Sequence, residues 1–175
     1  MNLSDALSLI RQVPDFPQPG ILFHDITPLL GNPHAFRKVV LEMSENNSEI
    51  DYVAGMEARG FIFASALSVE RNVGFIPIRK SGKLPSETFQ ESYGLEYGTD
   101  TLEIHKDCCT PSSKVLIVDD VLATGGTACA AIKLVQRTGA SVSKVVFLLE
   151  IEFLQGRKKI LSEFPDITIH SLKMI

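Results

Sequence analysis

Short apolar runs recur along the chain from residue 52 onward, and they restrict the possible folds more than any other feature. Most of these runs are apolar throughout and do not alternate with polar residues. They cover residues 52–56, 74–78, 115–118, 145–149 and 167–172. Strands of this kind are buried on both faces, as in a parallel sheet covered by helices. We therefore expect an α/β fold.

Helical patterns lie before and between these runs. Spacing, an Asn32-Pro33 start signal and a terminating Gly139 indicate the helix limits. The expected helices cover residues 3–10, 33–45, 60–70 and 126–137. Residues 14–20 carry three prolines and predict an irregular connection. The length of 175 residues suits a single domain.

The segment 79–105 departs from this alternation. It is polar, contains glycines and is too long for a simple connection. Insertions of this length in compact domains are usually functional, often as lids. Its later part, residues 93–105, alternates enough to predict a hairpin.

Composition excludes several classes of protein. Seventeen Lys and Arg against twenty-one Asp and Glu give a net charge of -4, which argues against a nucleic-acid-binding surface. Three cysteines, two of them adjacent, do not suggest a disulfide framework, so a reducing compartment is expected. The first twelve residues lack the pattern of a secretory signal, and no run of 18 apolar residues occurs. We expect a cytoplasmic protein that binds neither nucleic acid nor membrane.

The segment 115–127, with the sequence VLIVDDVLATGGT, carries the clearest functional signal. It reads as a buried strand, two carboxylates, a loop of small residues and a helix start. Ligands of open α/β sheets bind at the carboxyl ends of strands. Backbone N–H groups in such a loop can approach an anion closely, and the helix N-terminus adds partial positive charge. Residues 123–127 therefore predict a phosphate-binding loop that is neither a GxxxxGK[ST] nor a GxGxxG motif.

The adjacent Asp119 and Asp120 allow two interpretations. Two acids at a strand end can simply cap the next element, which is the usual role of an isolated Asp-Asp pair. Beside a phosphate loop, however, they would repel the phosphate unless they served another group. Vicinal sugar hydroxyls provide one, because carboxylates accept hydrogen bonds from them.

This 13-residue unit resembles the signature of the type I phosphoribosyltransferases. The resemblance implies that Asp119 and Asp120 face the ribose hydroxyls of 5-phosphoribosyl-1-pyrophosphate. It also implies that the 5-phosphate is bound by Ala123, Thr124, Gly125, Gly126 and Thr127.

Two further segments resemble the adenine phosphoribosyltransferases within that group. Residues 56–61, with the sequence MEARGF, resemble that family's pyrophosphate loop, which implies a cis peptide bond between Glu57 and Ala58. Arginine suits bidentate phosphate capture, although an isolated Arg59 could be an ordinary surface residue. Residues 79–85, with the sequence RKSGKLP, begin the expected lid. The resemblance implies that pyrophosphate is bound by Glu57, Ala58, Arg59, Arg79, Lys80 and Lys83.

The base site is implied by resemblance alone. Residues 15–26 resemble the hood that covers the base in this family, and they place Leu22, Phe23 and His24 near it. Phe23 would stack on the base. The family commonly has arginine where this chain has His24, so the effect on base specificity is open. Leu122 should border the pocket, and Glu96, in the lid, would be the acid/base residue.

Taken together, the resemblance covers most of the chain and implies a type I phosphoribosyltransferase fold. A small hood of about residues 1–30 would precede a core of about 31–175, with a lid of about 80–105. The implied reaction gives AMP and pyrophosphate from adenine, with Mg²⁺ held through pyrophosphate and water and with no direct protein ligand. Family members are usually homodimers. The alternatives are a phosphoribosyltransferase for another purine and a non-catalytic regulator that senses the same donor.

Glu96 gives a prediction of its own. If it exchanges a proton with the base, Glu96→Gln should lower kcat by about 10²–10⁴-fold, the range of general acid–base catalysis. Glu96→Ala should be at least as damaging, and donor binding should change little in both. Steady-state kinetics on the two variants checks this. If the Gln variant is nearly wild type and only the Ala variant fails, Glu96 merely closes the lid through a hydrogen bond.

Overall fold

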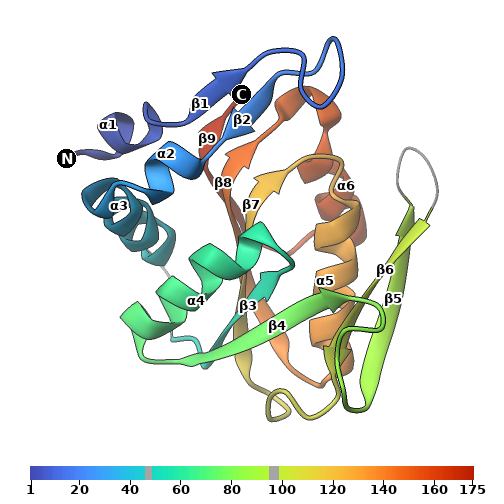
Figure 1. Cartoon of the computed structure of the whole chain (residues 1–175). Helices are drawn as coiled ribbons and strands as arrows, with labels where there is room; N and C mark the ends of the chain where they lie inside the picture. The colour runs from blue at the N-terminus through green and yellow to red at the C-terminus, as the bar shows by residue number, and fades with distance from the viewer. Residues whose placement is uncertain (46–48, 95–98) are drawn as a thin grey trace. The chain divides into compact units, whose positions relative to one another are not determined.

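The computed structural model describes residues 1–45, 49–94 and 99–175, and it separates the chain into two compact units. The first unit covers Met1–Glu45 and the second Asn46–Ile175. The expected hood ended near residue 30, whereas the first unit also includes the helix that follows. Figure 1 traces the elements of each unit in chain order. That the two units act as one domain stays a prediction.

The first unit is a small mixed unit. Its elements are α1 (Leu3–Leu7), β1 (Arg11–Val13), β2 (Phe23–Asp25), α2 (Thr27–Leu30) and α3 (Pro33–Ser44). Strands β1 and β2 pair antiparallel, and α3 packs against α1 and α2. The proline-rich connection between the strands is irregular, as predicted, and contains a cis bond between Phe16 and Pro17. The two short strands and α2 were not predicted.

The second unit is built on one sheet. In its described part, seven strands pair in the order β5-β6-β4-β3-β7-β8-β9. Five neighbouring strands, β4, β3, β7, β8 and β9, are parallel. Strands β5 and β6 form an antiparallel hairpin on the β4 edge. The strands are β3 (Tyr52–Met56), β4 (Gly74–Lys80), β5 (Thr88–Gly94), β6 (Thr99–His105), β7 (Lys114–Leu122), β8 (Ser141–Glu150) and β9 (Ile169–Met174). The parallel α/β prediction is confirmed.

Helices cover both faces of this sheet. They are α4 (Arg59–Arg71), α5 (Gly126–Arg137) and α6 (Gly156–Glu163), with a 3₁₀ turn, η1 (Glu152–Leu154), before α6. A Cβ on Gly55 would lie 2.6 Å from Cβ of Ala64, so this face of β3 contacts α4 directly. The neighbouring Ala54 and Met56 belong to the core cluster formed with α5. Since successive strand residues point to opposite faces, α4 and α5 lie on opposite sides.

The order of the strands defines where a ligand can bind. The chain leaves β3 through α4 toward β4, but it leaves β7 through α5 in the other direction, toward β8. Between β3 and β7 the strand order reverses, and open α/β sheets bind ligands at the carboxyl ends of strands at such a point. The predicted phosphate loop and the predicted pyrophosphate loop follow these two strands.

The polar segment 79–105 is more regular than the sequence suggested. The hairpin begins at Thr88, five residues before the predicted start, and its register runs from Thr88–His105 to Gly94–Thr99. The weak alternation of residues 88–94 hides this strand, because its side chains are all half-buried or exposed. Helix α6 was also missed, since its sequence is mostly polar. In the described ranges, no helix is long and apolar enough to cross a membrane.

The start of α3 gives a test of the fold. Asn32 Oδ1 accepts hydrogen bonds from the backbone N–H groups of His34 and Ala35, each at 3.1 Å. Asn32→Ala should lower the free energy of unfolding by about 1 kcal/mol, the usual effect of losing a helix cap. Asn32→Ser keeps a capping oxygen and should be close to wild type. Denaturant titration checks both, and an equal loss in the two variants would contradict the capping role.

Candidate active site

The paired carboxylates lie near the carboxyl end of β7. The sequence placed them just beyond the strand, but β7 continues through them to Leu122. Pairing with β3 ends at Gly55–Val118, whereas pairing with β8 continues to Leu122–Glu150. Asp119 therefore begins the part of β7 that extends past the end of its pairing with β3.

Asp119 and Asp120 differ in their surroundings. Asp120 is only 4% exposed, and its Oδ2 lies 2.8 Å from Nε of Arg59 in an ion pair. Asp119 Oδ1 accepts a hydrogen bond from the Asp120 N–H at 2.9 Å. Burial raises the pKa of both carboxyls, and the neighbouring charge of Asp120 raises the pKa of Asp119 further. The Arg59 guanidinium opposes the increase in the pKa of Asp120.

Gly60 allows the first turn of α4 to approach these acids. A Cβ at this position would lie 2.7 Å from Oδ1 of Asp119 and 3.0 Å from the Val118 carbonyl oxygen. Any side chain would therefore push α4 away from β7. Arg59, the first residue of α4 and the ion-pair partner of Asp120, would move with the helix. Gly60 thus brings the predicted pyrophosphate loop to the predicted ribose site.

The predicted phosphate loop connects β7 to the N-terminus of α5. Gly125 has φ 84°, a conformation that favours glycine, and a Cβ there would lie 2.6 Å from the Gly156 carbonyl oxygen. Gly156 is the first residue of α6, and nothing in the sequence marked it as part of the site. A small cavity is lined by Asp119, Leu122 and loop residues, so the structure brings these predicted residues together.

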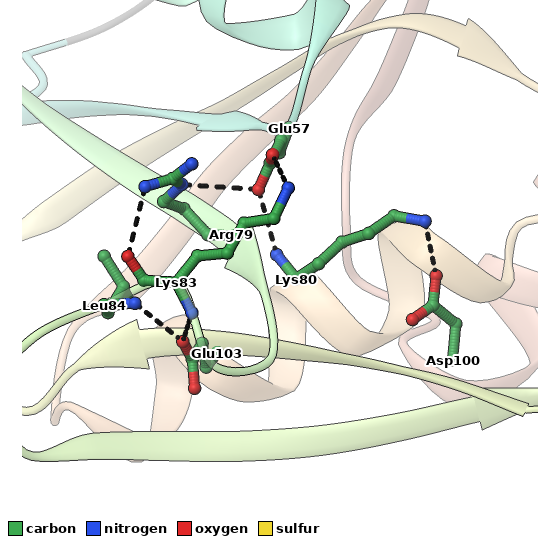
Figure 2. Close-up of polar contacts among 7 residues, drawn as sticks. All are labelled: Glu57, Arg79, Lys80, Lys83, Leu84, Asp100 and Glu103. Atoms are coloured by element: carbon green, nitrogen blue, oxygen red, sulfur yellow. Dashed lines mark hydrogen bonds and ion pairs between the residues drawn. The ribbon is translucent and has the colours of Figure 1, made fainter.

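Two of the predicted pyrophosphate cations, Arg79 and Lys83, contact Glu57 through their charged groups (Figure 2). Its carboxylate accepts hydrogen bonds from Nε of Arg79 at 3.3 Å, from the Lys80 N–H at 3.2 Å and from the ammonium of Lys83. Lys83 is the largest cause of a lowered pKa at Glu57. The peptide bond between Glu57 and Ala58 is cis, as the resemblance implied.

Two acids of β6 complete this cluster, and the sequence analysis did not identify either. Glu103 is 2% exposed, and its Oε1 accepts the N–H groups of Lys83 and Leu84, each at 3.0 Å. Burial alone would raise the pKa of Glu103, but these backbone hydrogen bonds lower it. Asp100 Oδ2 lies 2.9 Å from Nζ of Lys80. Alternation along β6 was the sequence signal that could have drawn attention to these two acids. The groups that the acids contact, however, depend on the register of β6 with β4 and β5.

The remaining predicted residues belong to the implied base site and lid. Phe23 and His24 are in β2 of the first unit, where the ring of Phe23 contacts that of Phe16 edge-on at 5.1 Å between centroids. Leu22 precedes β2 and is 49% exposed. Glu96 lies outside the described residues. Roles for all four residues stay predictions.

Comparisons with known proteins agree with this arrangement. A family model described as uracil phosphoribosyltransferase matches residues 72–174. The adenine phosphoribosyltransferase of Thermobifida fusca is 56% identical over 168 residues, which cover 95% of this chain and 93% of that protein. That of Acidobacterium capsulatum is 48% identical over 174 residues, with 98% and 94% covered.

Solved structures give the same result over nearly the whole chain. The adenine phosphoribosyltransferase of Thermoanaerobacter pseudethanolicus is 45% identical with a TM-score of 0.93, covering 99% of this chain and 100% of that one. The Saccharomyces cerevisiae enzyme, solved with adenine and an imino-altritol bisphosphate, is 40% identical with a TM-score of 0.89, covering 97% of each chain.

The two family names differ in the base. The uracil family model covers β4 to β9, which carry the phosphate loop, Arg79, Lys80 and Lys83. It leaves out Arg59 and residues 15–26 of the predicted hood. The adenine relatives match the chain almost end to end, hood included. On this evidence the chain belongs to the adenine phosphoribosyltransferase family and has the type I phosphoribosyltransferase fold.

Proposed function

We propose that the chain transfers the 5-phosphoribosyl group from 5-phosphoribosyl-1-pyrophosphate to adenine, giving AMP and pyrophosphate in purine salvage. The observation that carries this proposal is the position of Asp119 and Asp120. They lie where the strand order reverses, with the small-residue loop on one side and Arg59 on the other. A ribose bound there would have a phosphate site at each end. The naming of the relatives, and adenine in the yeast structure, support the choice of base.

In this reaction a purine ring nitrogen attacks the anomeric carbon, and the bond from that carbon to pyrophosphate breaks. Positive charge develops on the ribose, as in the oxocarbenium-like transition state of glycoside hydrolysis. Asp119 and Asp120 would orient the ribose hydroxyls and stabilise this charge. The burial of Asp120 strengthens the effect, because electrostatic interactions are stronger where water is excluded.

The leaving pyrophosphate would be held by Arg59, Lys80 and Lys83, with Arg79 and the Glu57–Ala58 peptide beside it. Residues 123–127 would hold the 5-phosphate through backbone N–H groups and threonine hydroxyls at the start of α5. Fixing both ends of the donor places the anomeric carbon between them. Most of the catalysis would then come from positioning and electrostatics.

Mg²⁺ would accompany the donor. The described residues contain no group of three or more His, Cys, Asp or Glu that could hold a metal ion. Mg²⁺ usually keeps several waters and binds through substrate phosphates, so we expect it to reach the site with pyrophosphate. When bound, the ion would neutralise negative charge that develops on pyrophosphate.

The base site is the part of the proposal that depends most on family resemblance. Phe23 would stack on adenine, with Leu22 and His24 beside it and Leu122 bordering the pocket. Glu96 would exchange the proton of the base. The hood, the core and the lid would act as one domain, in a cytoplasmic homodimer like most members of the family.

The base specificity can be tested directly. With donor and Mg²⁺, adenine should be converted far faster than hypoxanthine, guanine, xanthine or uracil. A spectrophotometric assay of nucleotide formation with each base measures this. Turnover of hypoxanthine or uracil comparable to that of adenine would overturn the assignment, and uracil would then agree with the family model over residues 72–174.

The acid pair gives a second test. Asp119→Asn combined with Asp120→Asn should lower kcat/KM by about 10²-fold or more, the effect of losing one strong electrostatic contact to a transition state. The fold should persist, because burial opposes charge on both carboxyls and Arg59 is exposed enough to be solvated.

The control for this test is the exposed Asp166→Asn, which alters one charge away from the site. Steady-state kinetics and thermal melting on all variants separate chemistry from folding. A folded double variant with near-normal turnover would show that the two acids are structural caps.

A further inference from the structure

A line of side chains in the β5–β6 hairpin joins the two predicted phosphate sites. Tyr93 and Asp100 are opposite each other in the hairpin register. The Tyr93 hydroxyl donates a hydrogen bond to Oδ2 of Asp100 at 3.3 Å, and the same oxygen lies 2.9 Å from Nζ of Lys80. Lys80 ends β4 and is one of the proposed pyrophosphate ligands.

The other end of this line reaches the phosphate loop. Burial raises the pKa of Tyr93, and a side-chain hydrogen bond with Thr127 opposes that effect. A Cβ on Gly126 would lie 3.3 Å from Cδ2 of Tyr93, so the ring packs against the first turn of α5. The line therefore runs from Lys80 through Asp100 and Tyr93 to Thr127.

The Lys80–Asp100 pair is accessible to a competing anion. The side chain of Lys80 is 54% exposed and that of Asp100 is 25% exposed. Asp100 is the largest cause of a raised pKa at Lys80, and Lys80 is the largest cause of a lowered pKa at Asp100. Both groups are thus charged at neutral pH, and the pair is held by attraction that a more highly charged ligand can replace.

Asp100 differs from Glu57, an acid that contacts Arg79 and Lys83. Glu57 belongs to the loop that carries Arg59, and its carboxylate also accepts a backbone N–H, so it is part of the site's framework. Asp100 lies on the hairpin, and Nζ of Lys80 bridges it to β4. Release of this one contact would free a proposed pyrophosphate ligand and remove a tie between the hairpin and β4.

We propose that Asp100 is a positioning residue that holds Lys80 in place of pyrophosphate and is displaced when the donor binds. This inference rests on the proposed function, because it assigns Lys80 to pyrophosphate. The displacement exchanges one ion pair for another and needs no covalent step. It also means that the hairpin responds to occupation of the pyrophosphate site through Asp100 and Tyr93.

The test is the affinity for inorganic pyrophosphate and the KM for the donor in Asp100→Asn. Removal of the competing carboxylate should tighten pyrophosphate binding about two- to five-fold, the strength of a half-exposed ion pair. The donor KM and the inhibition constant of pyrophosphate should fall by a similar factor, while the KM for adenine should not. Asp100→Glu keeps the charge and should behave like wild type.

Asp107→Asn is the matched control, since it removes the same charge from an exposed residue just past the other end of β6. A Lys80→Gln background completes a double-mutant cycle, in which Asp100→Asn should no longer tighten binding. Titration calorimetry at fixed ionic strength, with Mg²⁺ present, measures each variant.

The inference is overturned by unchanged or weaker pyrophosphate binding in a folded Asp100→Asn protein. It is also overturned by an equal gain in Asp107→Asn or in the Lys80→Gln background, since the effect would then be one of net charge. Either result with an active wild-type enzyme leaves the proposed function intact. A wild-type protein that neither binds pyrophosphate nor forms AMP would overturn the proposed function itself.

Discussion

The contact between the first turn of α4 and the end of β7 holds the candidate site together. Gly60 lies so close to Asp119 that no side chain fits, and this places Arg59 beside Asp120. The loop after β3 and the acids of β7 would otherwise be separate features of two strands. Because both strands are fixed in one parallel sheet, the distance between them is set by the core and not by the loops.

The electrostatics of the site follow from this packing. Carboxylates and cations lie close together, and pairs such as Arg59–Asp120, Lys83–Glu57 and Lys80–Asp100 offset each other in the absence of a ligand. The proposed donor has phosphate groups at both ends and hydroxyls between them. The cations that would bind its phosphates and the carboxylates that would bind its hydroxyls are already in place. Preorganised charges of this sort need little rearrangement when the reaction occurs.

Much of this arrangement could be predicted from the sequence, because the signals were local. The segment 115–127 contains its strand, acids, loop and helix start in 13 consecutive residues, and the resemblance supplied the cis bond after Glu57. The roles of Glu103 and Gly156 could not be predicted. Each role depends on which strand or helix lies beside the residue. Contacts between segments that are distant in the chain cannot be inferred from the residue spacing of a single sequence.

Gly156 has a consequence for how the C-terminal region should be viewed. Its backbone lies so close to Ala123 and Gly125 that the start of α6 supports the phosphate loop. A chain cut before residue 156 would keep the whole of segment 115–127 but would lose the contact with α6 that supports the loop. Recognition of the segment in a fragment or a shortened gene product is therefore no guarantee of a working phosphate site.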